Sequence, residues 1–299
     1  MDPPSLPPAI DSHQHFWVYS ENVQAWMDSR MGAIKRDFMP ADLAPLLSAA
    51  GFAGSVAVQA SQTPAETLFL LSLAEAPGST VRGVVGWCDL RAAPEALAAE
   101  LATLKSRHPK LVGMRHVVHD EPDDAFLLRE DVRRGIALLA AAGLAFDLLL
   151  FPRHLAPACA VVAENPRLTF VLDHIAKPHV AKRQANGGGA LEPPEWEADL
   201  RRLASFPNVA CKVSGMVTEA SWGEFENADF FPFLDVVFDA FGKGRVMIGS
   251  DWPVSTLSAS YSGTMGVVRA YLAARGFSAE EEAAVLGGTC ARVYRLPDP

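Results

Sequence analysis

The sequence has few features of a disulfide-rich or membrane-spanning protein. Four of its 299 residues are cysteine, widely spaced and without a Cys-x-x-Cys pair, so we expect reduced thiols rather than a disulfide framework or a structural zinc cluster. No segment approaches the ~18 consecutive apolar residues that a membrane helix needs. The first ten residues lack the basic region and apolar run of a signal peptide. These absences predict a cytoplasmic protein without a membrane partner.

Basic residues are fewer than acidic ones, and the sequence motifs of dinucleotide-binding proteins and of serine hydrolases are absent. The chain has 26 Lys and Arg against 35 Asp and Glu, a net charge of −9, which argues against nucleic acid as a partner because phosphate binding needs clustered basic residues. No G-x-G-x-x-G follows the first predicted strand, which disfavours a dinucleotide-binding fold. No G-x-S-x-G is present, which disfavours a serine hydrolase.

What the sequence does contain is a regular alternation of short apolar runs and helical patterns. Runs at 9–16, 55–60, 81–90, 111–118, 145–151, 168–175, 209–215 and 245–252 predict strands, and segments 40–51, 64–76, 94–108, 129–143, 154–164, 194–206 and 231–242 predict helices. Continuous apolar strands alternating with helices indicate a parallel sheet of βα units. We therefore expect an α/β protein, a (β/α)₈ TIM-type barrel forming a single domain over residues 1–299, with C-terminal helices at 264–296 packed on it. An open doubly wound sheet is the alternative.

Polar side chains gather at the C-terminal ends of the predicted strands, which a barrel brings to one rim. They include Asp11, His13, His15, Gln59, Arg115, His116, His119, Asp173, His174, Lys177, Lys212, Ser214, Asp251 and Trp252. His13 and His15 stand two apart in a strand and therefore face the same side. That geometry suits a divalent metal held by two imidazoles and further ligands, and it equally suits hydrogen bonds to a substrate or to neighbouring backbone.

Several motifs together resemble those of a known enzyme superfamily. They are AIDSHQHFW (9–17), GMRHVVHDEPDD (113–124), DLLLFPRHL (147–155), LDHIAKP (172–178), CKVSGM (211–216), MIGSDWP (247–253) and GGTCARVYRL (287–296). In this order they are similar to the amidohydrolase superfamily, and within it to the amidohydrolase-2 type, a lactonase branch. That branch includes L-fuconolactonases and other sugar lactonases, and the related 2-pyrone-4,6-dicarboxylate lactonases. The resemblance covers essentially the whole chain.

The resemblance implies roles for individual residues. Asp251 is expected to be the general base that activates water, with His174 as the second catalytic residue. His13, His15 and Asp251 are expected to hold at most one zinc or manganese ion, and whether catalysis requires it is left open. The lysine that bridges two metals in binuclear relatives is missing from GMRHVVH, so a second ion is not expected. Substrate-binding roles are expected for His13, His15, Gln59, Arg115, His116, His119, Lys177 and Trp252.

The scarcity of arginine near the predicted site narrows the substrate. A dicarboxylate would need several arginines to pair both of its carboxylates, and only Arg115 and Arg153 lie at strand ends. A neutral sugar lactone is therefore favoured, and the resemblance points to hydrolysis of L-fuconolactone to L-fuconate. Trp17, Trp26, Trp87, Trp222 and Trp252 could stack on a sugar ring or pack in the core. Rhamnono- or galactonolactone, 2-pyrone-4,6-dicarboxylate, a decarboxylase of the same superfamily and a non-catalytic sugar-binding barrel remain the alternatives.

Overall fold

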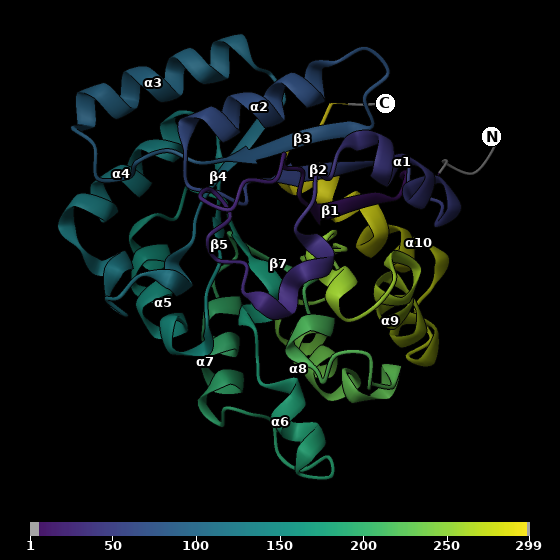
Figure 1. The fold of residues 1–299 in the computed structure, drawn as a ribbon. Coiled ribbons are helices and arrows are strands. Elements are labelled where there is room, and N and C mark those ends of the chain that lie inside the picture. Colours follow the sequence, from purple (N-terminus) through teal and green to yellow (C-terminus); the bar gives the residue numbers. More distant parts are fainter. Residues whose placement is uncertain (1–5, 298–299) are drawn as a thin grey trace, which may run out of the picture.

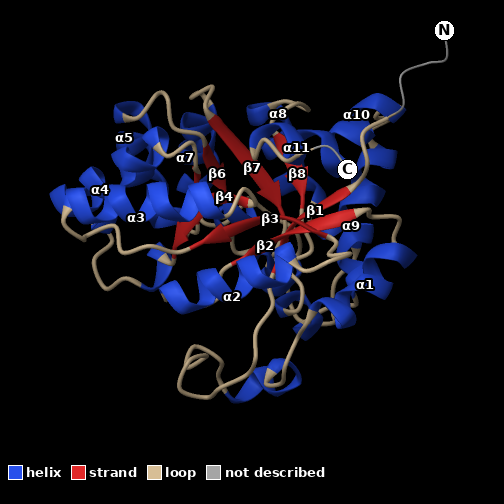
Figure 2. Cartoon of the chain, turned by 90° about the horizontal axis from the view of Figure 1, so that it is seen from above, coloured by secondary structure: helices blue, strands red, loops and turns tan. Residues whose placement is uncertain are grey.

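Eight parallel strands form one sheet that curves into a barrel (Figures 1 and 2). The computed structural model describes residues 6–297. The two ends of the predicted domain, residues 1–5 and 298–299, lie outside the described residues. The strands are β1 (Ile10–Gln14), β2 (Gly54–Val58), β3 (Val81–Gly86), β4 (Leu111–His116), β5 (Ala145–Leu148), β6 (Phe170–Leu172), β7 (Val209–Val213) and β8 (Val246–Ile248). Each pairs with the next in parallel. A bridge between Gln14 and Trp252 joins the two edges. The predicted (β/α)₈ barrel is confirmed.

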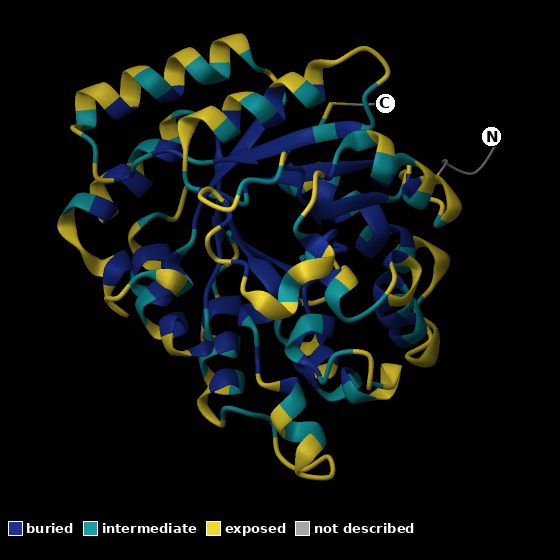
Figure 3. Ribbon diagram, in the orientation of Figure 1, coloured by how far each residue is buried: buried dark blue, intermediate teal, exposed yellow. Residues whose placement is uncertain are grey.

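Helices surround the sheet and cover its outer face (Figure 2). They are α1 (Pro40–Ala49), α2 (Pro64–Glu75), α3 (Pro94–Arg107), α4 (Glu130–Ala141), α5 (Leu155–Glu164), α6 (Val180–Ala185), α7 (Glu195–Ala204), α8 (Phe231–Phe241), α9 (Tyr261–Ala274), α10 (Ala279–Ala283) and α11 (Thr289–Val293). Their inward faces are buried and their outward faces exposed (Figure 3), as amphipathic helices on a sheet require. The short α6 lies between the predicted strand 168–175 and the predicted helix 194–206, where the sequence predicted no helix. Within residues 6–297, no helix is both long and apolar enough to span a bilayer.

The barrel interior is apolar at one end and polar at the other. A cluster of small and branched side chains fills the end where the strands begin: Ile10, Val56, Val58, Val85, Val112, Ala145, Val171, Ala210 and Met247, closed by Cys290 and Tyr294. Beyond this layer, buried ionisable side chains replace apolar ones. The register of β1 against β2 shifts between Asp11 and Gln14. That irregularity lets Ile10 and His13 both face inward, which strict alternation would forbid.

The strands are shorter than the apolar runs predict, always at the C-terminal end. The predicted run 168–175 ends as strand at Leu172, and 245–252 ends at Ile248. Beyond these points the backbone leaves the extended conformation: residues 174–177 and Asp251 have positive φ. Hydrophobic pattern reports burial, not backbone angle, so it could not mark these exits from the sheet.

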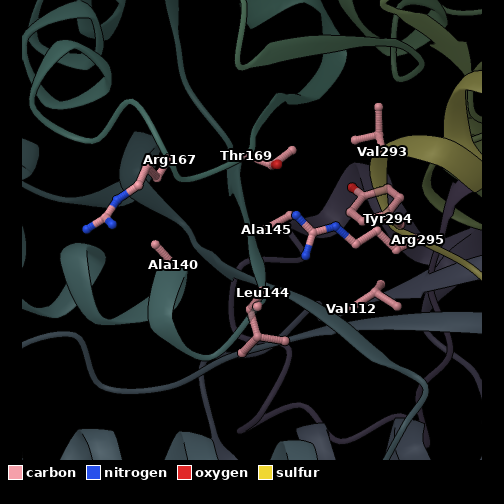
Figure 4. A pocket seen from close by; sticks show the side chains of 10 residues that line it. Val112, Ala140, Leu144, Ala145, Arg167, Thr169, Val293, Tyr294 and Arg295 are labelled. Atoms are coloured by element: carbon pink, nitrogen blue, oxygen red, sulfur yellow. The ribbon is translucent and has the colours of Figure 1, made fainter.

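The C-terminal segment covers the end of the barrel opposite the polar rim. Helix α11 contacts β1 and β8, and the Tyr294 hydroxyl behind it donates to Asp147 Oδ2 inside the barrel at 2.6 Å. Beside it is a small cavity of about 30 Å³ whose lining includes Val112, Leu144 and Arg295 (Figure 4). A cavity of this size holds a water molecule or two. This cavity is therefore too small for an organic substrate.

Candidate active site

Asp251 lies just beyond β8, at the floor of the polar rim. Its backbone N–H donates to the carbonyl of His13 at 2.8 Å, which fastens it to β1. Ser250, just before it, donates through both its backbone N–H and its hydroxyl to the buried Asp11 carboxylate. Asp251 has φ 56°, a left-handed conformation that costs a non-glycine residue about 1–3 kcal/mol. The surroundings hold this strained backbone and point the carboxylate into the barrel mouth.

His174 is presented by a left-handed turn that follows β6. All four residues from His174 to Lys177 have φ between 49° and 59°. The His174 ring packs directly on Gly215, where a Cβ atom would come within 2.5 Å of Nδ1. Its Nδ1 lies 2.8 Å from the Ser214 hydroxyl, and its Nε2 lies 3.8 Å from Asp251 Oδ1. The turn and the glycine together aim this imidazole at Asp251.

Electrostatics keep Asp251 charged and His174 neutral. Burial opposes the charge of Asp251, but the imidazoles of His174 and His15 outweigh it and hold the pKa of this carboxyl below its usual value. Burial also lowers the pKa of His174 well below that of an exposed histidine, although Asp251 partly offsets this effect. A carboxylate held ionised in such a site can accept a proton from water at neutral pH.

Three lone pairs converge between His13, His15 and Asp251. His15 Nδ1 lies 2.7 Å from the carbonyl of Val58, so it carries the proton and leaves the Nε2 lone pair free. That nitrogen lies 3.2 Å from Asp251 Oδ1 and 3.2 Å from His13 Nε2. His13 Nδ1 in turn lies 3.3 Å from an Asp173 oxygen. Acceptors that meet at such distances, with each imidazole oriented by an oxygen behind it, fit one divalent cation.

A second group, which shares only His13 with the first, is already paired with cationic side chains. His13, Asp173 and His174 also lie close enough to hold an ion. However, Asp173 Oδ2 accepts from Arg115 at 2.9 Å, and Asp173 Oδ1 lies 3.1 Å from Lys212 Nζ. These cations outweigh the effect of burial and hold the pKa of Asp173 well below its usual value. The group of His13, His15 and Asp251 is therefore better suited to a cation than this second group.

A cavity of about 650 Å³ opens above these groups. Of the residues predicted from the sequence, His15, Arg115, His119, His174, Lys177 and Asp251 line it. Apolar side chains form much of the remaining wall: Val23, Trp26, Met31, Val117, Leu149, Phe151, Trp222, Val254 and Leu257. Its volume and its mixed lining are typical of a small-molecule site.

Four predicted residues lie behind the cavity wall instead of on it. His13 is fully buried beneath His15. Gln59 accepts from Arg115 at 3.0 Å and orients the guanidinium. His116 lies between Glu121, Trp87 and Phe126, turned away from the cavity. Trp252 packs against Phe16 and Phe38. The expectation that Gln59, His116 and Trp252 touch substrate is thus replaced by supporting contacts, because a strand-end position alone does not say which side a residue faces.

Sequence reasoning overlooked two charged residues of the cavity, Asp120 and Glu219. Glu219 ends the 3₁₀ turn Val217–Glu219, which follows β7, and it lines the cavity beside Lys177. It comes six residues past the strand end, so a search restricted to strand ends could not reach it. Trp26 and Trp222, two of the five tryptophans considered for stacking, also line the cavity, whereas Trp17 is buried in the core.

The sequence of the chain is similar to known proteins over nearly its whole length. A model of the amidohydrolase family matches residues 10–296. An L-fucono-1,5-lactonase from Burkholderia multivorans is 42% identical over 295 residues, 97% of either chain. An L-fucono-1,5-lactonase from Burkholderia ambifaria is 37% identical over 296 residues, 97% of this chain and 96% of its own.

A solved structure agrees with the fold over the same length. A crystal structure of an amidohydrolase from Burkholderia multivorans with bound zinc superposes with a TM-score of 0.87. It is 41% identical, and the match covers 97% of this chain and 100% of the other. The similarity in sequence and in structure therefore extends over the whole barrel rather than over one motif.

Proposed function

The chain belongs to the amidohydrolase family, and we propose that it hydrolyses the ring ester of a sugar lactone, with L-fuconolactone as the expected substrate. It is a hydrolase that acts on a cyclic carboxylic ester. The observation that carries the proposal is the ionised, buried Asp251 between His15 and His174 at the floor of a cavity large enough for a sugar ring. The similarity to two L-fucono-1,5-lactonases supports the choice of substrate.

Asp251 acts as the general base of the reaction. Its carboxylate takes a proton from a water molecule as the water oxygen attacks the lactone carbonyl. The hydrogen bond from the Asp251 backbone N–H to the His13 carbonyl holds the residue in place, and the left-handed backbone at residue 251 keeps its carboxylate facing the cavity. When the ring C–O bond breaks, the protonated Asp251 returns its proton to the departing alkoxide. One residue thus serves both proton transfers.

His174 supplies a hydrogen-bond donor for the oxyanion that forms during the attack. The Ser214 hydroxyl lies 2.8 Å from Nδ1 and can donate to it, an arrangement that places the His174 proton on Nε2, the nitrogen nearer Asp251. A donor fixed before the reaction stabilises developing charge without reorganisation. A divalent ion held by His13, His15 and Asp251 would add Lewis-acid polarisation of the lactone carbonyl when bound.

The charges that line the cavity favour a neutral substrate over a dicarboxylate. Arg115 reaches the cavity, but its guanidinium donates to Asp173 and to the side chain and carbonyl of Gln59. Arg153 pairs with the exposed Asp124. Neither arginine is left to bind a carboxylate bidentately, as recognition of a dicarboxylate would require. Glu219 in the wall would moreover repel an anion.

The experiment that tests this function is a pH-indicator screen of purified protein against a set of aldonolactones and 2-pyrone-4,6-dicarboxylate, with and without a chelator. Lactone opening releases acid, so all substrates report through one signal. We expect L-fuconolactone and close stereoisomers to give the highest kcat/KM. Faster opening of the pyrone dicarboxylate than of any aldonolactone would overturn the proposal, as would release of CO₂ without ring opening.

The same proposal includes a cytoplasmic location and a sugar lactone as the binding partner. All four cysteines are buried, free thiols, a state that a reducing compartment preserves. The acidic net charge of −9 gives no support to nucleic acid as a partner. Fractionation of the source cells, with activity measured in each fraction, tests the location.

A further inference from the structure

Lys177 and Glu219 form an ion pair in the cavity wall that the proposed reaction does not use. Lys177 ends the left-handed turn after β6, and Glu219 ends the 3₁₀ turn after β7, so two separate strand-end segments bring them together. Nζ and Oε1 are 3.6 Å apart, and each side chain is 20% exposed. Both line the cavity that holds Asp251. The pair is therefore accessible to a ligand but largely shielded from bulk solvent.

The pair leaves most of its hydrogen-bonding capacity unused. Charge-assisted N–H···O bonds are usually about 2.7–2.9 Å long, so a separation of 3.6 Å is a loose contact. Over residues 6–297, no other side-chain hydrogen bond involves Lys177 Nζ or the Glu219 carboxylate. An ammonium has three donors, and a carboxylate can accept on both oxygens. Polar groups with free valences in a mostly apolar cavity are the ones that fix the orientation of a ligand.

Aromatic and polar side chains flank the pair in the cavity wall. Lys177 Nζ lies 5.9 Å from the centre of the Phe151 ring, which His119 also stacks on. Thr218 lies next to Glu219 in the same wall. This wall thus offers a fixed cation and a fixed anion side by side, a donor next to an acceptor, where a neutral polyol would find partners for two oxygens.

We propose that Lys177 and Glu219 read two neighbouring hydroxyl groups of the lactone, Lys177 donating to one oxygen and Glu219 accepting from the other. This assignment rests on the proposed function and deepens it, because it defines the substrate class as lactones that carry adjacent free hydroxyls. A hydroxyl both donates and accepts, so two neighbouring hydroxyls match this pair, whereas a carboxylate substrate would be repelled by Glu219. Lys177 and Glu219 are specificity residues and take no part in the proton transfers.

The test compares Glu219→Gln and Lys177→Met with the wild type on two substrates. One is the polyhydroxylated L-fuconolactone, and the other is δ-valerolactone, the same ring without hydroxyls. For L-fuconolactone we expect KM to rise by about tenfold or more, with a much smaller change in kcat, since Lys177→Met removes the charged donor and Glu219→Gln removes the charge of the acceptor. The preference for L-fuconolactone over δ-valerolactone, as the ratio of kcat/KM values, should fall by a similar factor.

A matched pair on the surface provides the control. Lys182 and Glu192 lie 3.3 Å apart, with Lys182 60% exposed, and neither lines the cavity. Glu192→Gln and Lys182→Met should leave both kinetic constants unchanged. Thermal melting of each variant checks that the fold is kept.

The outcomes separate this inference from the function on which it rests. A wild-type enzyme that opens no aldonolactone would remove the proposed function itself. An active wild type, with KM for L-fuconolactone unchanged in Glu219→Gln and Lys177→Met, would overturn the assignment of the pair alone. So would a fall in kcat with no change in KM, because that result would place the pair in the chemical step.

Discussion

The residues that we propose as catalytic are held in conformations that an isolated chain avoids. His174 and Asp251 both have positive φ, and a left-handed L-residue costs about 1–2 kcal/mol relative to its usual conformation. Such strain persists only where the surroundings determine the geometry. Here Gly215 beneath the His174 ring and the Asp11–Ser250 hydrogen bonds next to Asp251 provide that constraint.

At this scale, replacing the general base is the most direct test of catalysis. Asp251→Asn removes the proton acceptor while keeping the shape of the side chain, so we expect kcat for lactone hydrolysis to fall about 10²–10⁴-fold. Ligand affinity, measured by calorimetry with the product, should change far less. The surface variant Asp239→Asn, which breaks only an exposed pair with Arg201, should behave as the wild type. Unchanged turnover in Asp251→Asn would remove Asp251 from the mechanism.

Replacing Gly215 with alanine should displace the His174 ring, because the added methyl group would meet that ring. Gly215 has φ 57°, and an added Cβ would meet the His174 ring within 3 Å. We expect Gly215→Ala to lower kcat by about a hundredfold, since a displacement of about 1 Å can cost that much. Gly244→Ala, where a Cβ meets nothing within 4 Å, is the matched control. Equal activity of the two variants would show that the position of His174 is unimportant.

Among the elements, the start of α2 carries a buried carboxylate that orders part of the cavity wall. Glu66 accepts from the backbone N–H groups of Ala60 and Ser61, and both of these residues line the cavity. Burial raises the pKa of Glu66 from 4.5 to about 7, although these hydrogen bonds and the charge of Arg115 oppose the effect. The folded protein therefore binds this proton more tightly than the unfolded chain.

Stability should accordingly depend on pH through Glu66. Its protonated form stabilises the fold below pH 4.5, and that contribution is lost as the pH rises through about 7. Relative to Glu66→Gln, which cannot titrate, the wild type should lose about 2–3 kcal/mol of unfolding free energy between pH 4.5 and 8. Urea denaturation at several pH values measures the difference. The exposed Glu164→Gln should show no such trend, and a constant difference for Glu66→Gln would contradict the prediction.

The elements themselves were largely predictable, and their ends were not. Apolar runs and helical spacing located all eight strands and the main helices, because burial of a parallel strand on both faces leaves a direct mark in the sequence. The strand ends were overextended where His174 and Asp251 leave the sheet, since no local pattern encodes a left-handed backbone at those residues. Helix α6 was missed because six residues give too few periods to recognise.

For the molecule as a whole, the barrel interior depends on a balanced set of buried charges. Lys212 donates to Asp147 Oδ2 at 2.6 Å and lies 3.1 Å from Asp173. All three side chains are fully buried. Although burial disfavours a charged lysine, the two carboxylates outweigh it and raise the pKa of Lys212. The ammonium is therefore the central counter-charge of the core.

Removing this cation should destabilise the entire barrel. Lys212→Met leaves Asp147 and Asp173 buried without their shared partner, and we expect a loss of about 3–5 kcal/mol in unfolding free energy. Denaturant titration at pH 7.5 measures it. Lys243→Met, which breaks a surface pair with Glu281, should cost less than about 1 kcal/mol. A small loss for Lys212→Met would mean that the carboxylates are neutral in the native protein.

The site as a whole was predictable in membership more than in orientation. Chain order and strand ends brought His13, His15, His174 and Asp251 to one rim, because a closed barrel leaves those positions no other place. Whether a side chain faces the cavity or packs behind its wall depends on contacts between distant strands. The sequence therefore placed Gln59, His116 and Trp252 at the cavity, whereas in the structure they lie behind its wall. The role of Lys212 as a counter-ion was likewise not predictable, because the sequence alone does not show that Asp147 and Asp173 lie beside it.

The contact between the two edges of the barrel, β1 and the end of β8, also determines the stage of folding at which the enzyme becomes active. His15 and Asp251 are 236 positions apart in the chain yet 3.2 Å apart in space. Contacts of such long sequence separation form late, because the intervening chain must first be ordered. Intermediates that already contain most of the strands should consequently be inert during refolding. Hydrolytic activity should reappear only with the last kinetic phase, in which the first and eighth strands join.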